Sequence, residues 1–109
     1  MQQQLSKINK NIKNININTI NNQELKLKDG KYIGQVVNGL PEGKGIWYGT
    51  KEPYIGDRYE GEWRNGKKEG KGIYYYNNGY RSMGDYSNGE PIRKHVVLTK
   101  NGEVKTNYY

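Results

Sequence analysis

The chain has 109 residues and a formal net charge of +7, and it contains 11 tyrosines, 15 glycines, one histidine and no cysteine. This length accommodates one small domain. The lack of cysteine excludes a disulfide framework and a thiolate metal site, and one histidine is no basis for a histidine-rich zinc site. Abundant Asn, Gly and Tyr, with no Ala, disfavour a helical bundle. The positive charge favours acidic partners such as nucleic acid, anionic lipid or a tubulin-like protein surface.

Residues 1–23 form an N-terminal segment that is rich in Asn and Ile and has no acidic residue. Its apolar residues recur at intervals of three, four and three, which places them on one side of a helix: Leu5, Ile8, Ile12 and Ile15. The alternation NININ that follows fits an extended strand. Because Asn is a poor helix former, such a helix would form only against another surface. We therefore expect an extended or short-helical docking arm.

Two other interpretations of this segment stay open. A disordered tail is ordinary at a chain terminus. A mitochondrial presequence would also lack acidic residues, but the absence of arginine and the scarcity of serine make it a poor fit.

From Glu24 onward the chain contains an internal repeat. Residues 32–48, YIGQVVNGLPEGKGIWY, shifted by 27 fall on residues 59–75, YEGEWRNGKKEGKGIYY, and ten of the 17 positions are identical. A further shift of 23 gives a weaker third copy, and the longer first interval predicts a longer loop at TKEPYIGDR. We divide the chain into an arm, 1–23, and a repeat domain, 24–109, with copies at about 32–54, 59–81 and 82–104 and a partial copy at 25–30.

Each copy predicts a β-hairpin. Within Tyr59–Trp63, alternation places both aromatic residues and the glycine between them on one face. The following Asn65-Gly66 tolerates positive φ and predicts a tight turn. A second strand at 70–76 has glycine at alternate positions, Gly70 and Gly72. Glycine weakens a strand, so we expect an aromatic ring to lie flat over each bare backbone. The candidate rings are Trp47, Tyr59 and Trp63.

A phosphate cradle does not fit this glycine-rich stretch, because the spacing differs from GxxxxGK[ST] and strand-like residues follow it. YEGEWRNGKKEGKG instead resembles the MORN (membrane occupation and recognition nexus) repeat, whose consensus is similar to YEGEW-x-NG-x-x-x-G-x-G. The resemblance covers residues 32–102. It implies an all-β fold, a long, twisted, single-layer antiparallel meander of β-hairpins. It also implies scaffold roles in ciliary and cytoskeletal assemblies, roles in membrane-junction proteins, and accessory roles in lipid kinases and a histone methyltransferase.

The third copy departs from the repeat pattern. Ser82 replaces the opening tyrosine, and Arg93 and His95 stand where the paired glycines belong. Since terminal units of a repeat stack are often atypical, we interpret the strand at 95–98 as an end cap.

Our first functional hypothesis is a non-catalytic scaffold subunit of a large assembly, located in the cytoplasm and cytoskeleton, with a ciliary axoneme as the leading case. A short stack leaves its end strands unpaired and its aromatic face uncovered, so other protein subunits are the expected partners. Alternatively, the aromatic residues only complete the glycine packing of the repeat itself. The predicted partner-binding residues are Leu5, Ile8, Ile12, Ile15, Trp47, Trp63, Tyr74 and Tyr86.

The alternative hypothesis is a phosphoinositide- or anionic-membrane-binding adaptor. Each surface lysine near an anionic leaflet contributes about 1 kcal/mol. Glutamates interleave with these basic residues, which is also the pattern of an ordinary solvated strand face. The candidate lipid-binding residues are Lys44, Arg64, Lys67, Lys68 and Lys71.

Other classes of function find little support. Nucleic acid is a poor candidate because no single-strand or groove-reading motif accompanies the basic charge. His95 has no nucleophile signature beside it, and Asp57 and Asp85 form no spaced carboxylate pair, so we predict no enzyme, small-molecule substrate, cofactor or metal. No apolar run is long enough to cross a bilayer or to form the core of a signal peptide.

Overall fold

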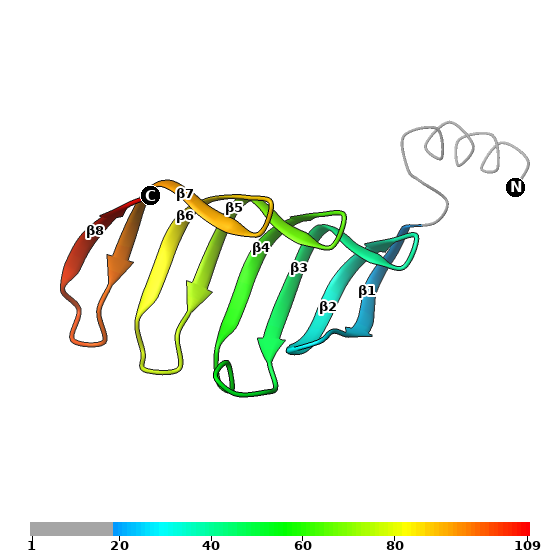
Figure 1. Ribbon diagram of the computed structural model, residues 1–109, viewed down its shortest axis with the longest axis horizontal. Coiled ribbons are helices and arrows are strands. Elements are labelled where there is room, and N and C mark those ends of the chain that lie inside the picture. Colours follow the sequence, from blue (N-terminus) through cyan, green and yellow to red (C-terminus); the bar gives the residue numbers. More distant parts are fainter. Residues whose placement is uncertain (1–18) are drawn as a thin grey trace, which may run out of the picture.

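The computed structural model describes residues 19–109, which form one eight-stranded antiparallel sheet (Figure 1). Strand order follows chain order, so every strand pairs with its neighbours in sequence. This confirms the predicted single-layer meander of hairpins, whereas the predicted arm conformation concerns residues that lie mostly outside the described ones. The strands are β1 (Thr19–Lys26), β2 (Gly30–Val37), β3 (Leu40–Gly49), β4 (Arg58–Arg64), β5 (Lys67–Tyr75), β6 (Arg81–Ser87), β7 (Glu90–Leu98) and β8 (Val104–Tyr108).

Asn-Gly turns close the three hairpins β2–β3, β4–β5 and β6–β7. Both residues of each turn have positive φ, at 53° and 80° for Asn38-Gly39, 49° and 83° for Asn65-Gly66, and 54° and 90° for Asn88-Gly89. Two consecutive positive φ values are typical of a type I′ turn, which suits the twist of the flanking strands. The predicted turns are therefore confirmed, and the predicted longer loop lies between β3 and β4.

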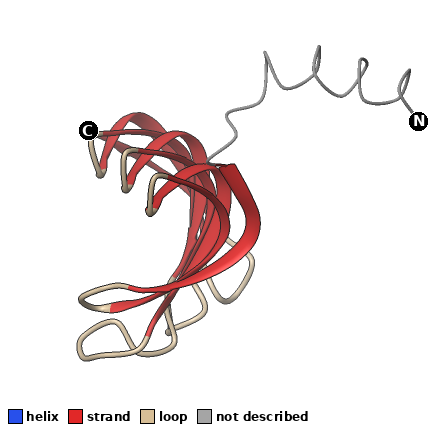
Figure 2. Cartoon of the chain, turned by 90° about the vertical axis from the view of Figure 1, so that its right-hand side faces the viewer, coloured by secondary structure: helices blue, strands red, loops and turns tan. Residues whose placement is uncertain are grey.

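The sheet is bent along its strands into an open trough, which Figure 2 shows along the row of strands. Each hairpin has a register shift near its glycine of this region, between Gly34 and Val36 in the first and at the equivalent place, between Gly61 and Trp63, in the second. The third hairpin has its shift between Met83 and Asp85. A β-bulge bends its strand and increases the local twist. Repetition of the bulge in every hairpin therefore gives the sheet one concave face and one convex face.

A row of five glycines crosses the sheet, each opposite the next in neighbouring strands: Gly34, Gly45, Gly61, Gly72 and Gly84. Rings occupy the space that their side chains would fill. A Cβ on Gly45 would collide with the Tyr32 ring, and one on Gly72 would collide with the Tyr59 ring. The expectation of rings over glycines is thus confirmed for Tyr59. Trp47 lies instead against Gly30, and the Trp63 indole N–H donates to the Gly45 carbonyl at 3.1 Å.

The expectation that both paired glycines lie beneath rings is wrong for Gly70. Its φ is 74°, and Gly43 in the first hairpin has φ 85°, because each is the middle one of three residues that stand opposite a single residue in the bulge. Glycine adopts this conformation without steric cost. Beside Gly70, the Glu62 carboxylate accepts the backbone N–H of Lys71 at 2.7 Å. Gly70 therefore shapes the bulge, and only the second glycine of the pair seats a ring.

The interpretation of residues 95–98 as an end cap is also wrong, because β7 pairs with β8 beyond it. Tyr109 donates its backbone N–H to the Arg93 carbonyl at 2.9 Å and lies 23 positions after Tyr86. β8 thus repeats the position of β6. At the other edge, β1 spans the division drawn at residues 23 and 24 and includes the first two residues of the partial copy predicted at 25–30.

Candidate functional site

A continuous series of rings in edge-to-face contact fills the concave side of the sheet. The series runs Tyr32, Trp63, Tyr59, Tyr86, His95 and Tyr109, with centroids 5.0 to 5.3 Å apart and interplanar angles between 76° and 87°. This is a favoured aromatic geometry. Tyr32, Tyr59 and His95 are completely buried. The sheet therefore has its core between its own curved strands, without a second layer among the described residues.

Each buried ring directs a polar atom to the same backbone position of its hairpin. The Tyr32 hydroxyl donates to the Gln35 carbonyl at 2.6 Å, and the Tyr59 hydroxyl donates to the Glu62 carbonyl at 3.1 Å. Burial raises the pKa of Tyr32 to about 12 and raises the pKa of Tyr59 further. Both tyrosines therefore stay protonated donors throughout the neutral range.

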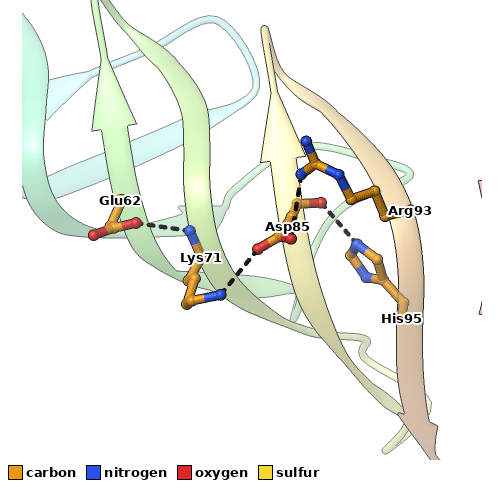
Figure 3. Close-up of polar contacts among 5 residues, drawn as sticks. All are labelled: Glu62, Lys71, Asp85, Arg93 and His95. Atoms are coloured by element: carbon orange, nitrogen blue, oxygen red, sulfur yellow. Dashed lines mark hydrogen bonds and ion pairs between the residues drawn. The ribbon is translucent and has the colours of Figure 1, made fainter.

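His95 takes this role in the third hairpin. Its Nε2 is 2.8 Å from the Asp85 carbonyl oxygen (Figure 3), and its ring lies over Gly84. A carbonyl only accepts, so Nε2 carries the hydrogen. In the neutral imidazole, Nδ1 then accepts from the Ser82 hydroxyl at 2.9 Å. His95 thus supplies the buried ring that tyrosine supplies in the other two hairpins. Ser82 occupies the position of that tyrosine.

An open groove of about 430 Å³ lies on the concave face beside this series. Its lining includes all four aromatic residues that the sequence assigned to partner binding: Trp47, Trp63, Tyr74 and Tyr86. Trp47, Trp63 and Tyr86 are only 5 to 9 % exposed, so the expectation that they form an exposed patch is wrong. They are buried among the rings of the chain itself. They form the floor of the groove.

Tyrosines from loops and chain segments beside the strands form the walls of the groove. Tyr54, Tyr76 and Tyr109 are 38 %, 42 % and 56 % exposed. Tyr54 packs edge-to-face on Trp47 with centroids 5.9 Å apart, and Tyr76 lies 4.6 Å from the Tyr74 ring. Neither Tyr54 nor Tyr76 was assigned to partner binding from the sequence. Tyr54 lies outside the alternating pattern of a strand, and Tyr76 was placed only as the last residue of the predicted strand at 70–76.

Asp57 anchors one of these walls. Its carboxylate accepts the Tyr74 hydroxyl at 2.6 Å and the backbone N–H of Asn77 at 2.8 Å, and it is 8 % exposed. Burial and this carboxylate raise the pKa of Tyr74. Asp57 therefore joins the loop before β4 to the loop after β5. Its role here is structural.

Comparison with known protein families matches the MORN repeat at residues 32–51 and 59–79. These segments contain the hairpins β2–β3 and β4–β5, whose glycines and rings have been described above. The chain is a MORN repeat protein. Comparison with curated proteins finds no match. The MORN repeat is a non-catalytic module that mediates protein or lipid interactions, so this protein has a protein-interaction or membrane-association module.

The third hairpin of this MORN repeat protein has the same geometry with different residues. β6–β7 keeps the Asn-Gly turn, the bulge and a ring over a glycine. Arg93 occupies the bulge position of Gly70 with φ 61°. Structural equivalence therefore assigns a third repeat at β6–β7, in agreement with the weak internal similarity.

The structure divides the predicted lipid-binding residues between two faces, so they do not form one patch. Lys68 lies opposite Trp63 on the concave face and lines the groove. Lys44 and Lys71 lie on the convex face, opposite Glu62 and Asp85. Arg64 and Lys67 lie opposite each other beside the turn.

Charged residues form a small network on the convex face around Asp85 (Figure 3). Its carboxylate is 3.3 Å from Lys71 Nζ and 3.4 Å from an Arg93 guanidinium nitrogen. The hydrogen bond from Lys71, with a smaller effect of Arg93, holds the pKa of Asp85 below its usual range. Both cations are largely exposed, so this network contributes little to stability.

A row of basic and aromatic residues crosses the convex face in direct register. Its members are Lys26, Lys31, Tyr48, Arg58, Tyr75 and Arg81. The Tyr75 ring lies between two guanidinium groups, with Arg58 at 4.0 Å and Arg81 at 5.5 Å from its centroid. Lys31 Nζ is 5.8 Å from the Tyr48 centroid. This row was not predicted from the sequence, because its members come together only when six strands are in register.

Several predictions are not decided by this geometry. Leu5, Ile8, Ile12 and Ile15 lie outside the described residues. Within residues 19–109, no group of three or more His, Cys, Asp or Glu residues is placed to hold a metal ion. The same part of the chain has no helix that is long and apolar enough to span a membrane.

Proposed function

We propose that the protein is a non-catalytic scaffold subunit that binds a segment of a partner protein in its concave groove. One observation carries this proposal: exposed tyrosines surround a groove of about 430 Å³ whose floor is a buried aromatic series. Concave sites with aromatic lining are typical of binding surfaces, and aromatic residues are enriched at protein interfaces. The groove thus supports protein binding better than the convex face does.

Photo-crosslinking tests this proposal directly. A photoreactive phenylalanine analogue at position 76 would lie in the groove wall, and the same analogue at position 71 would lie on the convex face as a matched control in the same chain segment. We expect partner proteins to crosslink from position 76 and not from position 71. The reverse pattern would contradict binding in the groove.

We further propose that the assembly is cytoskeletal, with a ciliary axoneme as the leading case. The scaffold roles implied by the repeat support this assignment. Affinity purification of the full chain from its source cell, followed by mass spectrometry, tests it. Co-purification with axonemal or other cytoskeletal proteins is the expected outcome. Recovery in membrane fractions without such proteins would contradict it.

The N-terminal segment is proposed as a second attachment to the assembly. Deletion of residues 1–18 leaves the whole of β1 in place. We expect the variant to keep the thermal unfolding of the parent chain and to be released from its assembly. If the shortened chain stays in the assembly, the segment has no role in attachment.

A membrane-association function is the second candidate, and the convex face favours it. The row at Lys26, Lys31, Arg58 and Arg81 has four cations and no acid. The next row of this face contains four apolar residues and two acids, of which Glu60 pairs with Arg58 at 2.7 Å: Glu24, Ile33, Ile46, Glu60, Ile73 and Met83. Basic groups above apolar ones suit an anionic bilayer surface. Sedimentation with phosphatidylserine or phosphoinositide vesicles tests it. Substitution of Lys26, Lys31 and Arg81 by glutamate should abolish binding, and substitution of Lys44 and Lys67 should not.

A further inference from the structure

Lys68 is a cation in the middle of an aromatic groove. Its Nζ lies 5.4 to 5.7 Å from the ring centroids of Trp47, Tyr59 and Tyr74. Register places it where the first and third hairpins have Pro41 and Pro91, opposite Val36 and Tyr86. The fold therefore does not require a cation at this position, since the other two hairpins form without one.

No side chain of the described part of the chain supplies an acceptor to this ammonium, which lies open to the groove. No hydrogen bond or ion pair joins Lys68 Nζ to another residue in the described part of the chain. Burial lowers its pKa, and the negative charge of Glu90 opposes this effect only in part. Aromatic faces stabilise a cation, but they supply no acceptor for its three N–H groups. A partly buried cation with no ion-pair partner in residues 19–109 favours an anionic group in the groove.

We infer that the groove binds a partner segment with an aspartate or glutamate between apolar or aromatic side chains, whose carboxylate accepts from Lys68 Nζ. This inference rests on the proposed function of the groove and adds the chemistry of its occupant. Charge complementarity carries it: the ammonium needs an anion, and the rings beside it need apolar contacts. The chain's own residues 1–18 contain no acid, so they do not supply this group.

A peptide selection on the full chain tests the inference. A display library of short random peptides is selected in parallel on the parent protein and on its Lys68→Glu variant. We expect an acidic residue at one position among binders of the parent. We expect lysine or arginine at that position among binders of the variant. Binders with the same residues in both selections would overturn the inference.

Affinity measurements then give the size of the effect. The best peptide is compared with its version in which the acidic residue is replaced by the matching amide, and we expect about tenfold or more weaker binding. Lys68→Met should remove this difference. Lys68→Pro, which copies the first and third hairpins, serves as a second variant should Lys68→Met unfold. Equal affinity of the acid and amide peptides for the parent chain would overturn the inference.

Tryptophan fluorescence separates this inference from the proposed function. Both tryptophans line the groove, so a peptide bound there changes their emission. Peptides that change the emission but show no acidic preference would overturn the inference and leave groove binding intact. Binders that never change it would overturn both. Self-association of the parent chain that Lys68→Met abolishes would make a second copy the occupant and overturn the assignment to another protein.

Discussion

The second and third hairpins place the same kind of group in the same space by different routes. In β4–β5, Tyr59 on the first strand covers Gly72 on the second. In β6–β7, the ring comes from the second strand, where His95 covers Gly84 on the first. Both rings are completely buried, and both donate a hydrogen bond to the equivalent carbonyl.

This comparison shows what the repeat requires. It requires one flat ring with a hydrogen-bond donor over one bare backbone, and either strand can supply the ring. When the ring moves to the second strand, the tyrosine position becomes Ser82, whose hydroxyl is hydrogen-bonded to the imidazole. The third repeat is therefore equivalent to the others in packing, although its sequence lacks the opening tyrosine and both paired glycines.

Removal of either ring should give the largest effect. We expect Tyr59→Ala and His95→Ala each to lower the free energy of unfolding by about 3–5 kcal/mol, because each interrupts the aromatic series and leaves a cavity. Urea unfolding followed by tryptophan fluorescence measures this. Tyr108→Ala, at a residue that is 77 % exposed, is the control. A large effect for Tyr59 alone would show that the two rings are not equivalent.

A side chain introduced at the glycine under the ring should have the next largest effect on stability. Gly72→Val places a Cβ against the Tyr59 ring and should cost about 1–3 kcal/mol through overpacking. Lys94→Val, on an exposed position of β7, is a matched control with the same introduced residue. If Gly72→Val unfolds at the same midpoint temperature as the parent chain, the Tyr59 ring does not pack directly on the Gly72 backbone.

Transfer of the third arrangement to the second hairpin sharpens the comparison. The Tyr59→Ser and Gly72→His changes should each be destabilising alone, whereas together they recreate the pair of Ser82 and His95. We expect a favourable coupling of about 0.5–3 kcal/mol between them in a double-mutant cycle. Simple additivity of the two costs would mean that the exchange depends on other residues of the third hairpin.

The bulge position should give a smaller gain. Arg93 has φ 61°, where an L-residue is strained, and the equivalent Gly70 is not. Arg93→Gly should raise the free energy of unfolding by about 1 kcal/mol, since the ion pair it removes is exposed. Gly70→Arg should lower it by a similar amount. Chemical denaturation measures both, and a loss of stability in Arg93→Gly would contradict the strain.

The smallest effect concerns acid. The folded state lowers the pKa of Asp85, so this group contributes stability above its unfolded pKa of about 4 and loses it as pH falls through the lower folded value. Unfolding free energy measured against pH should therefore show a small acid-dependent loss. Asp85→Asn should remove that part of the loss. An unchanged acid profile would show that the network with Lys71 and Arg93 has no energetic effect.

Much of the fold was predictable from local patterns. Alternation predicted the strand at Tyr59–Trp63, and Asn-Gly pairs predicted the hairpin turns, because both signals depend on neighbouring residues only. The ring over Gly72 was also predicted from spacing. The bulge at Gly70 was not predicted, because a glycine that lies under a ring and a glycine that forms part of a bulge cannot be told apart in the sequence of one strand. The packing of the His95 ring over Gly84 was not predicted either, because Gly84 lies on another strand.

The candidate site was less predictable than the fold. Repeat spacing was enough to place Trp47, Trp63, Tyr74 and Tyr86 on one side of a sheet, since side chains alternate along every strand. The amino-acid order left open whether that side faces solvent, because curvature arises from bulges that act together across adjacent strands. In the folded sheet these residues form the floor of the groove. The loop tyrosines surround them, and Lys68 lies among the rings. Local chemistry thus sets the strands, and the summed curvature of the sheet makes the groove.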